Sequence, residues 1–256
     1  MKPKAHKHIT KSVLESYKFN LHFSPREIKW ILRGTSLEDW WSPRQRIRNW
    51  HFYKSNDFIK NREYFLLGKS YTTSERRVEK LISKLKSKSG NRKRFITLGR
   101  IIHHIQDMST PSHVVPIFHG PGKADVYETY MMKYIESDID FIAGVTLKND
   151  ADDFRTLYEK FALLSLAHLE SKTIPISNGS ESNISFDKIW TPYPKLKDNK
   201  YIGFGDFGEY GSCFNAEPLD GVAQIDIKAI YRHFTTQAAQ STYEALLYFK
   251  DIHKGK

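Results

Sequence analysis

The chain has 256 residues, a formal net charge of +11 at pH 7 and a single cysteine, Cys213. One cysteine excludes an intramolecular disulfide and a thiolate metal cluster, and the lack of a long apolar run excludes a membrane-spanning helix. The excess of lysine and arginine predicts an anionic partner such as phospholipid headgroups, nucleic acid or an acidic surface. With no linker-like break, a chain of this length is expected to form one domain over residues 1–256.

Helical signals dominate the chain, because apolar residues recur at intervals of three and four. Ser24, Pro25 and Glu27 have the pattern of a capping box with proline at the first helical position, and Gly34 could close the helix that follows. Strand-like alternation is scarce, so the sequence predicts an all-α fold with several helices. The expected helices span about 6–18, 24–34, 75–88, 92–108, 124–138, 151–170 and 226–251.

One long segment, near 173–222, lacks a helical period and is expected to be an irregular insertion. It carries several prolines and a stretch rich in glycine and aromatic residues at 201–210. These aromatic side chains could flank a cleft or touch a lipid surface. Alternatively, Phe204, Phe207 and Tyr210 could pack onto the helices.

Three potential metal ligands lie along and just beyond the helix expected at 92–108. His103 and Asp107 are four residues apart, so their side chains share one helical face. Pro111 is expected to end the helix, and His113 would then return to the same place. A carboxylate between two imidazoles suits zinc. A separate apolar stripe would seat this helix in the core, and it consists of Leu98, Ile101, Ile102 and Ile105.

A basic protein with 11 histidines will show some histidine–aspartate spacings by chance. Similar residues, however, recur in order elsewhere in the chain. His6 lies in an early helix, Asp39 precedes two tryptophans, and His51 opens the tripeptide His-Phe-Tyr. Asp125 and Glu128 open the helix that follows His113.

This ordered set resembles the zinc-dependent phospholipase C family and the related single-strand-specific fungal nucleases. The resemblance covers roughly residues 1–140 and implies an all-α domain of the phospholipase C type. Glu128 matches the carboxylate of a closing ligand pair. The other ligand positions of the family correspond here to His6, Asp39, His51, His103, Asp107 and His113.

Two positions depart from the family pattern. Ala124 stands where the family has the histidine of the closing pair, and either Asp125 or His119 could replace that ligand. The family also uses the free amine of an amino-terminal tryptophan, and this chain begins with Met1. Either the amine of Met1 takes this role, or Met1 was added to a trimmed sequence, or that metal position is weakened.

The resemblance implies at least two zinc ions and, with all positions filled, three. One ion would be held by Asp39, His51, His103 and Asp107. Asp107 would bridge to a second ion, bound also by His6 and the amine of Met1. The third would be held by His113, Glu128 and Asp125. Asp39 would also act in catalysis, as acceptor of a proton from the attacking water.

The implied activity is release of a phosphorylated headgroup from phospholipids at a membrane surface. A single-strand nuclease remains the nearest alternative, although His51-Phe-Tyr and the lack of disulfides favour the phospholipase. A basic lipid- or nucleic-acid-binding module with a structural or degenerate metal site is the third possibility. The resemblance also implies secretion or an extracytoplasmic location, while the sequence shows no signal peptide.

Overall fold

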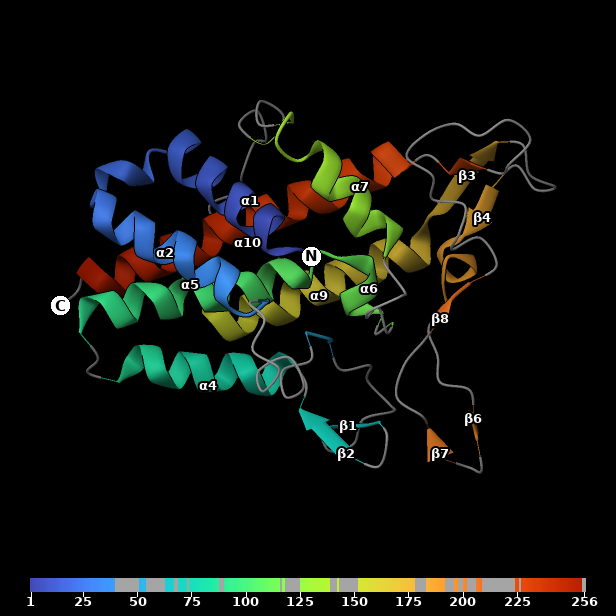
Figure 1. The fold of residues 1–256 in the computed structure, drawn as a ribbon, viewed down its shortest axis with the longest axis horizontal. Coiled ribbons are helices and arrows are strands. Elements are labelled where there is room, and N and C mark those ends of the chain that lie inside the picture. Colours follow the sequence, from blue (N-terminus) through green and yellow to red (C-terminus); the bar gives the residue numbers. More distant parts are fainter. Residues whose placement is uncertain are drawn as a thin grey trace.

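The computed structural model of the protein (Figure 1) is mostly helical, with little sheet, as the sequence predicts. It describes residues 1–39, 51–53, 63–66, 69–72, 74–87, 90–115, 117, 125–138, 142, 152–177, 183–191, 196–197, 200–201, 206–208, 224–225 and 227–254.

The α-helices in these residues are α1 (Pro3–Ser16), α2 (Pro25–Leu37), α4 (Ser74–Lys86), α5 (Asn91–Asp107), α6 (Pro111–Val114), α7 (Val126–Tyr134), α9 (Phe154–Ser171) and α10 (Ile227–Lys254). Two 3₁₀ turns, η1 (Phe19–Leu21) and η2 (Phe186–Lys188), add to them. Among the described helices, none has the length and apolar character needed to cross a bilayer.

Helix α5 is the centre of the bundle, and α2, α4, α9 and α10 all pack against it. The apolar stripe predicted for this helix is confirmed, because Leu98, Ile101, Ile102 and Ile105 are fully buried. The helix ends at Asp107, one residue before the end expected from the sequence. Pro111 instead begins α6, where a missing backbone N–H is tolerated.

The backbones of α2 and α5 are in direct contact where the two helices cross. A Cβ atom added at Gly34 would overlap the carbonyl oxygen of Ile96, and one added at Gly99 would overlap that of Ile31. The prediction that Gly34 closes α2 is therefore wrong, because the helix continues to Leu37. Gly34 lies within the helix, where the lack of a side chain allows the close approach of α5. The predicted capping box at Ser24 and Glu27 is confirmed.

The described residues of the predicted irregular insertion contain no α-helix beyond 171 and form short antiparallel strands and one 3₁₀ turn. Phe207 pairs with Trp190 and is partly buried against the core, while Phe204 and Tyr210 lie outside the described residues. The strands here are β3 (Thr173–Ser177), β4 (Asn183–Ser185), β5 (Trp190–Thr191), β6 (Leu196–Lys197), β7 (Lys200–Tyr201) and β8 (Asp206–Phe207), and β9 (Gln224–Ile225), just beyond the insertion, pairs with β3. Earlier in the chain, β1 (Glu63–Leu66) and β2 (Lys69–Thr72) form an antiparallel hairpin.

Candidate metal centre

The carboxylate of Asp107, at the end of α5, has imidazole nitrogens on both of its oxygens. Its Oδ1 lies 3.2 Å from Nε2 of His6, which α1 supplies. Its Oδ2 lies 3.0 Å from Nδ1 of His51 and 3.2 Å from Nε2 of His103. The structure therefore brings together ligands that are about 100 residues apart in the chain.

Asp39 faces the same cluster from just beyond α2. Its Oδ1 lies 3.6 Å from Nδ1 of His51 and 3.7 Å from Nε2 of His103, and its Oδ2 lies 3.9 Å from Nε2 of His6. These distances are too long for hydrogen bonds. Within the described part of the chain, Oδ2 of Asp39 and Nε2 of His6 are buried with no hydrogen-bond partner. A cation between them would remove the cost of burying two unsatisfied polar atoms.

Three histidines of the cluster have their ring tautomer set by an acceptor behind them. Nδ1 of His103 lies 2.8 Å from the carbonyl oxygen of Thr35, and Nδ1 of His113 lies 2.8 Å from that of His51. Nδ1 of His6 lies 2.7 Å from the side-chain oxygen of Gln106. Because these oxygens only accept, each Nδ1 carries the proton, and each Nε2 of a neutral ring offers a lone pair to the cluster.

The orientation of the Gln106 amide follows from its other partners. The hydroxyl of Thr242 donates to the carbonyl oxygen of Ala238 at 2.7 Å, so it accepts from the amide nitrogen of Gln106, also at 2.7 Å. The amide oxygen of Gln106 must then face His6. Helix α10 thus orients a ligand on α1 through a side chain on α5.

The buried carboxylates of the cluster favour a positive charge beside them. Burial alone would lower the pKa of His103, but the carboxylates of Asp107 and Asp39 outweigh it and raise this pKa to about 9. Burial likewise opposes ionisation of Asp107, yet His113, the terminal amine and His103 hold its pKa well below the usual range. Nε2 of His103 and Nδ1 of His51 lie only 3.0 Å apart, which requires a shared proton or a cation between them.

A second set of groups adjoins Oδ1 of Asp107. The amine of Met1 lies 3.3 Å from this oxygen and 2.7 Å from Nε2 of His113, and it forms an ion pair with Glu128. Nε2 of His113 lies 3.1 Å from Oε1 of Glu128. Burial would lower the pKa of the amine, but Glu128 and Asp107 raise it to about 11. The structure therefore brings Met1, His113 and Glu128 together beside Asp107.

Asp125 is buried next to this second set, but its carboxylate has other partners. It caps α7 by accepting from the backbone N–H of Tyr127 at 3.0 Å, and it accepts from the hydroxyl of Ser112 at 2.5 Å. Its role as a ligand stays a prediction. The alternative ligand His119 and the departure at Ala124 lie outside the described residues.

Glu38 is a buried residue of the site that the sequence analysis missed. Arg77 of α4 donates to both of its carboxylate oxygens, at 3.0 and 3.1 Å, and Arg100 of α5 donates to one of them. Burial would raise the pKa of Glu38, but His104 and the two arginines hold it well below the usual range. Glu38 thereby fastens the end of α2, where Asp39 lies, to α4 and α5.

His104, the neighbour of His103, belongs to this ionic network. Its Nε2 lies 3.4 Å from Glu38 and its Nδ1 lies 3.1 Å from the hydroxyl of Ser74. Burial lowers the pKa of His104 to about 3, so the ring is neutral and both nitrogens have partners.

Three overlapping groups of side chains could therefore hold a metal ion. Two of them share His103, and the third consists of Glu38, His51 and His104. The arginines on Glu38 already neutralise the third group, which makes the two groups around His103 the better candidates. Imidazole nitrogens and carboxylate oxygens are ligands that zinc accepts, so these residues fit the metal that the sequence predicts. The two groups around His103 comprise His6, Asp39, His51, His103 and Asp107.

Replacing His103 or His104 by alanine should separate the metal ligands from the supporting network. We expect His103→Ala to lose bound zinc, because its Nε2 points into the cluster. His104→Ala should retain zinc but unfold more easily, since it withdraws a partner from Glu38. Metal content after gel filtration, together with chemical denaturation, measures both effects. Equal zinc loss in the two variants would mean that the cluster extends to His104.

No family model, curated protein or solved structure matches this chain. The structure itself shows a mostly helical domain with buried histidine–aspartate groups that could bind a metal.

Proposed function

We propose that the protein is a zinc-dependent phosphodiesterase of the phospholipase C type, which releases a phosphorylated headgroup from phospholipids. The observation that carries this proposal is the Asp107 carboxylate, which has histidine nitrogens on both oxygens and faces the unpartnered atoms of His6 and Asp39. Burying carboxylates and unpartnered polar atoms without a cation beside them costs free energy of folding.

The proposed ligands fall into groups according to which carboxylate oxygen of Asp107 they adjoin. Asp39, His51 and His103 would hold one ion with Oδ2, and His6 and the amine of Met1 would hold a second with Oδ1. A third ion would use His113, Glu128 and Asp125, the last of which would give up its hydrogen bond from Ser112. Zinc ions screen phosphoryl oxygens and lower the pKa of a water that they bind.

The chain's own residues suggest where a substrate enters. The side chains of Asp39 and His51 are 12% and 11% exposed, whereas those of His6, His103 and Asp107 are fully buried. A phosphodiester would therefore approach from the side of Asp39. Its carboxylate would accept a proton from the attacking water, and the fully buried ligands behind it would keep their orientation.

Turnover on two substrate classes tests the proposal. We expect zinc-loaded protein to hydrolyse phosphatidylcholine faster than single-stranded DNA or RNA at matched ionic strength. Chelation should remove the activity and added zinc should restore it. Asp39→Asn serves as the control against a contaminating enzyme, because it should lose turnover while it remains folded.

The other outcomes identify the alternatives. Strong cleavage of nucleic acid without headgroup release would assign the protein as a nuclease, which its net charge of +11 also suits. Bound zinc without turnover on either substrate would indicate a binding module with a structural metal.

A further inference from the structure

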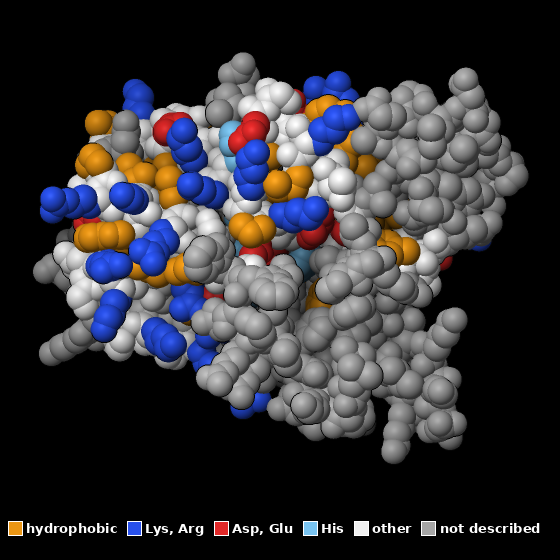
Figure 2. All heavy atoms as spheres, in the orientation of Figure 1, with side chains coloured by type: hydrophobic (Ala, Val, Ile, Leu, Met, Phe, Trp, Pro, Cys, Tyr) orange, Lys and Arg blue, Asp and Glu red, His pale blue; other side chains and the backbone are white. Residues whose placement is uncertain are grey.

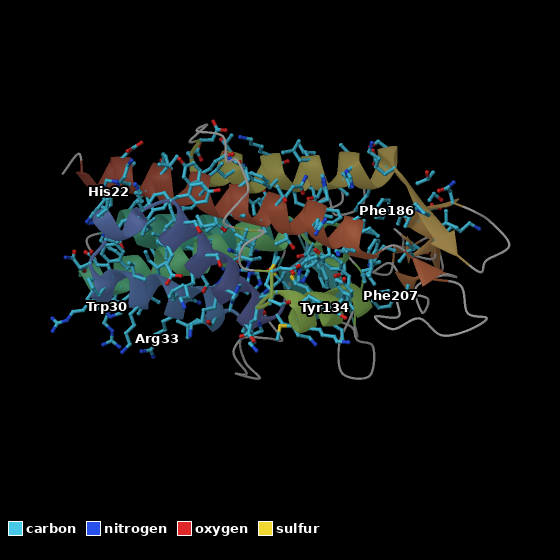
Figure 3. The ribbon with its side chains drawn as sticks, turned by 90° about the horizontal axis from the view of Figure 1, so that it is seen from above. His22, Trp30, Arg33, Tyr134, Phe186 and Phe207 are labelled. Atoms are coloured by element: carbon cyan, nitrogen blue, oxygen red, sulfur yellow. The ribbon has the colours of Figure 1, made fainter. Side chains whose placement is uncertain are left out.

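A groove of about 950 Å³ lies along α2 and beside α1, and its lining runs from Pro25 to Leu37, two residues before Asp39. In Figure 2 this part of the surface shows lysine and arginine side chains around apolar ones. Figure 3 shows that Trp30 and Arg33 project from α2 on the same side of the bundle. The groove therefore combines charge with apolar surface.

The cations of the groove share one side of α2. Arg26, Lys29 and Arg33 are exposed and recur at intervals of three and four, and Lys7 adds a charge from α1. Among the residues that the structure describes, none of these four has an acidic partner. The carboxylate of Glu27, the nearby acid, caps its own helix at Ser24. Four cations beside this one carboxylate leave a net positive field, which favours an anionic ligand.

The apolar lining favours lipid over nucleic acid. Ile28, Trp30 and Leu32 are partly buried and pack against the core. The ring of Trp30 lies against Phe95, with 6.3 Å between the ring centroids. Binding of single strands uses open aromatic faces for base stacking. Here the one aromatic ring of the lining packs against Phe95, and the other apolar residues of the lining are aliphatic. Basic side chains beside aliphatic ones and a tryptophan are typical of helices at a lipid interface.

We infer that this groove docks the protein on bilayers that contain anionic phospholipid. Arg26, Lys29 and Arg33 contact lipid phosphates, while Trp30 and Leu32 lie at the level of the glycerol backbone. Asp39 lies two residues beyond the end of α2, so docking along this helix would hold the proposed metal centre near the lipid surface, a step that rests on the proposed function. Docking does not require hydrolysis, so it can be tested separately from the proposed function.

Two triple variants with the same change of charge test the inference. R26Q/K29Q/R33Q removes cations of the groove, and K80Q/K84Q/K93Q removes exposed lysines of α4 and α5. Sedimentation with vesicles of phosphatidylcholine, with and without 30% phosphatidylglycerol, measures binding. One cation near an anionic surface contributes roughly a fivefold factor, so the groove variant should bind the mixed vesicles about a hundredfold more weakly. The control should bind nearly as the unmodified protein does.

Turnover of a soluble phosphodiester, bis(p-nitrophenyl) phosphate, separates docking from chemistry. Both triple variants should match the unmodified protein in this assay. If the unmodified protein has no turnover, the proposed function fails while the vesicle result still stands. Equal loss of vesicle binding in both variants, or equal binding to both vesicle types, would overturn the docking surface. So would loss of binding to a single-stranded oligonucleotide that exceeds the loss of vesicle binding.

Fluorescence quenching places the contact at the groove itself. Brominated lipid in the mixed vesicles should quench part of the tryptophan emission, and Trp30→Phe should reduce that quenched part. Unchanged quenching in Trp30→Phe would show that another surface meets the bilayer.

Discussion

Asp107→Asn should remove the proposed zinc ions and the proposed phosphodiesterase activity together. The amide keeps the volume of the carboxylate but loses its charge, and its NH₂ group would face imidazole nitrogens that should bind metal. Loss of an outer partner of a ligand already costs about 10- to 100-fold in metal affinity, so loss of the central carboxylate should cost more than about 100-fold. Zinc titration and turnover on phosphatidylcholine measure the two effects.

Asp251→Asn is the matched control for this change, because its side chain is 65% exposed at the end of α10. It should leave zinc content and turnover unchanged. If Asp107→Asn binds zinc as the unmodified protein does, the cluster is a buried network of protons and charges rather than a metal centre.

Glu38→Gln should destabilise the fold by about 3 kcal/mol, because two arginines would be left against a neutral amide in a largely buried place. Arg77 and Arg100 are 14% and 19% exposed, so water can compensate only in part. Chemical denaturation at pH 7 measures the loss. Glu15→Gln removes an exposed pair with Lys11 and should change the free energy of unfolding by less than about 0.5 kcal/mol.

The effect of Glu38→Gln should depend on pH in a defined direction. The folded-state pKa of Glu38 is held below its ordinary value of 4.5, so its carboxylate stabilises the fold fully above that value. As the pH falls below about 4.5, the unfolded chain takes up a proton first, and the contribution declines. The difference between the two proteins should therefore stay constant from pH 8 to pH 5 and shrink in stronger acid. A difference that grows with acid would mean that Glu38 is not the ionised partner.

Local spacing was sufficient to predict that His103, Asp107 and His113 lie close together. His103 and Asp107 are one helical turn apart, and His113 follows through a short connection, so few backbone geometries are open to them. The positions of the helices could also be predicted, because a helix that buries one face has apolar residues at intervals of three and four. These features depend on neighbours within a few residues, which a sequence displays directly.

The supporting residues could not be predicted in this way. Glu38 meets Arg77 and Arg100 only after α2, α4 and α5 have packed, and no periodicity marks such a pairing. Gln106 reads as an ordinary polar residue of a helix until His6 is placed beside it. Gly34 was misread because a glycine near a helix end and a glycine at a helix crossing look alike in sequence.

The crossing of α2 and α5 also bears on which ion the protein selects. Gly34 directly precedes Thr35, the carbonyl partner of His103, and Gly99 lies one turn before His103 itself. These two glycines therefore determine how closely Asp39, just beyond α2, can approach His103 and Asp107 on α5. Zinc binds nitrogen and oxygen at about 2.0–2.2 Å and calcium binds oxygen at about 2.3–2.6 Å. If the cluster holds a metal ion, as we propose, its selection by ionic radius would be decided in the packed core, by how closely these two backbones approach.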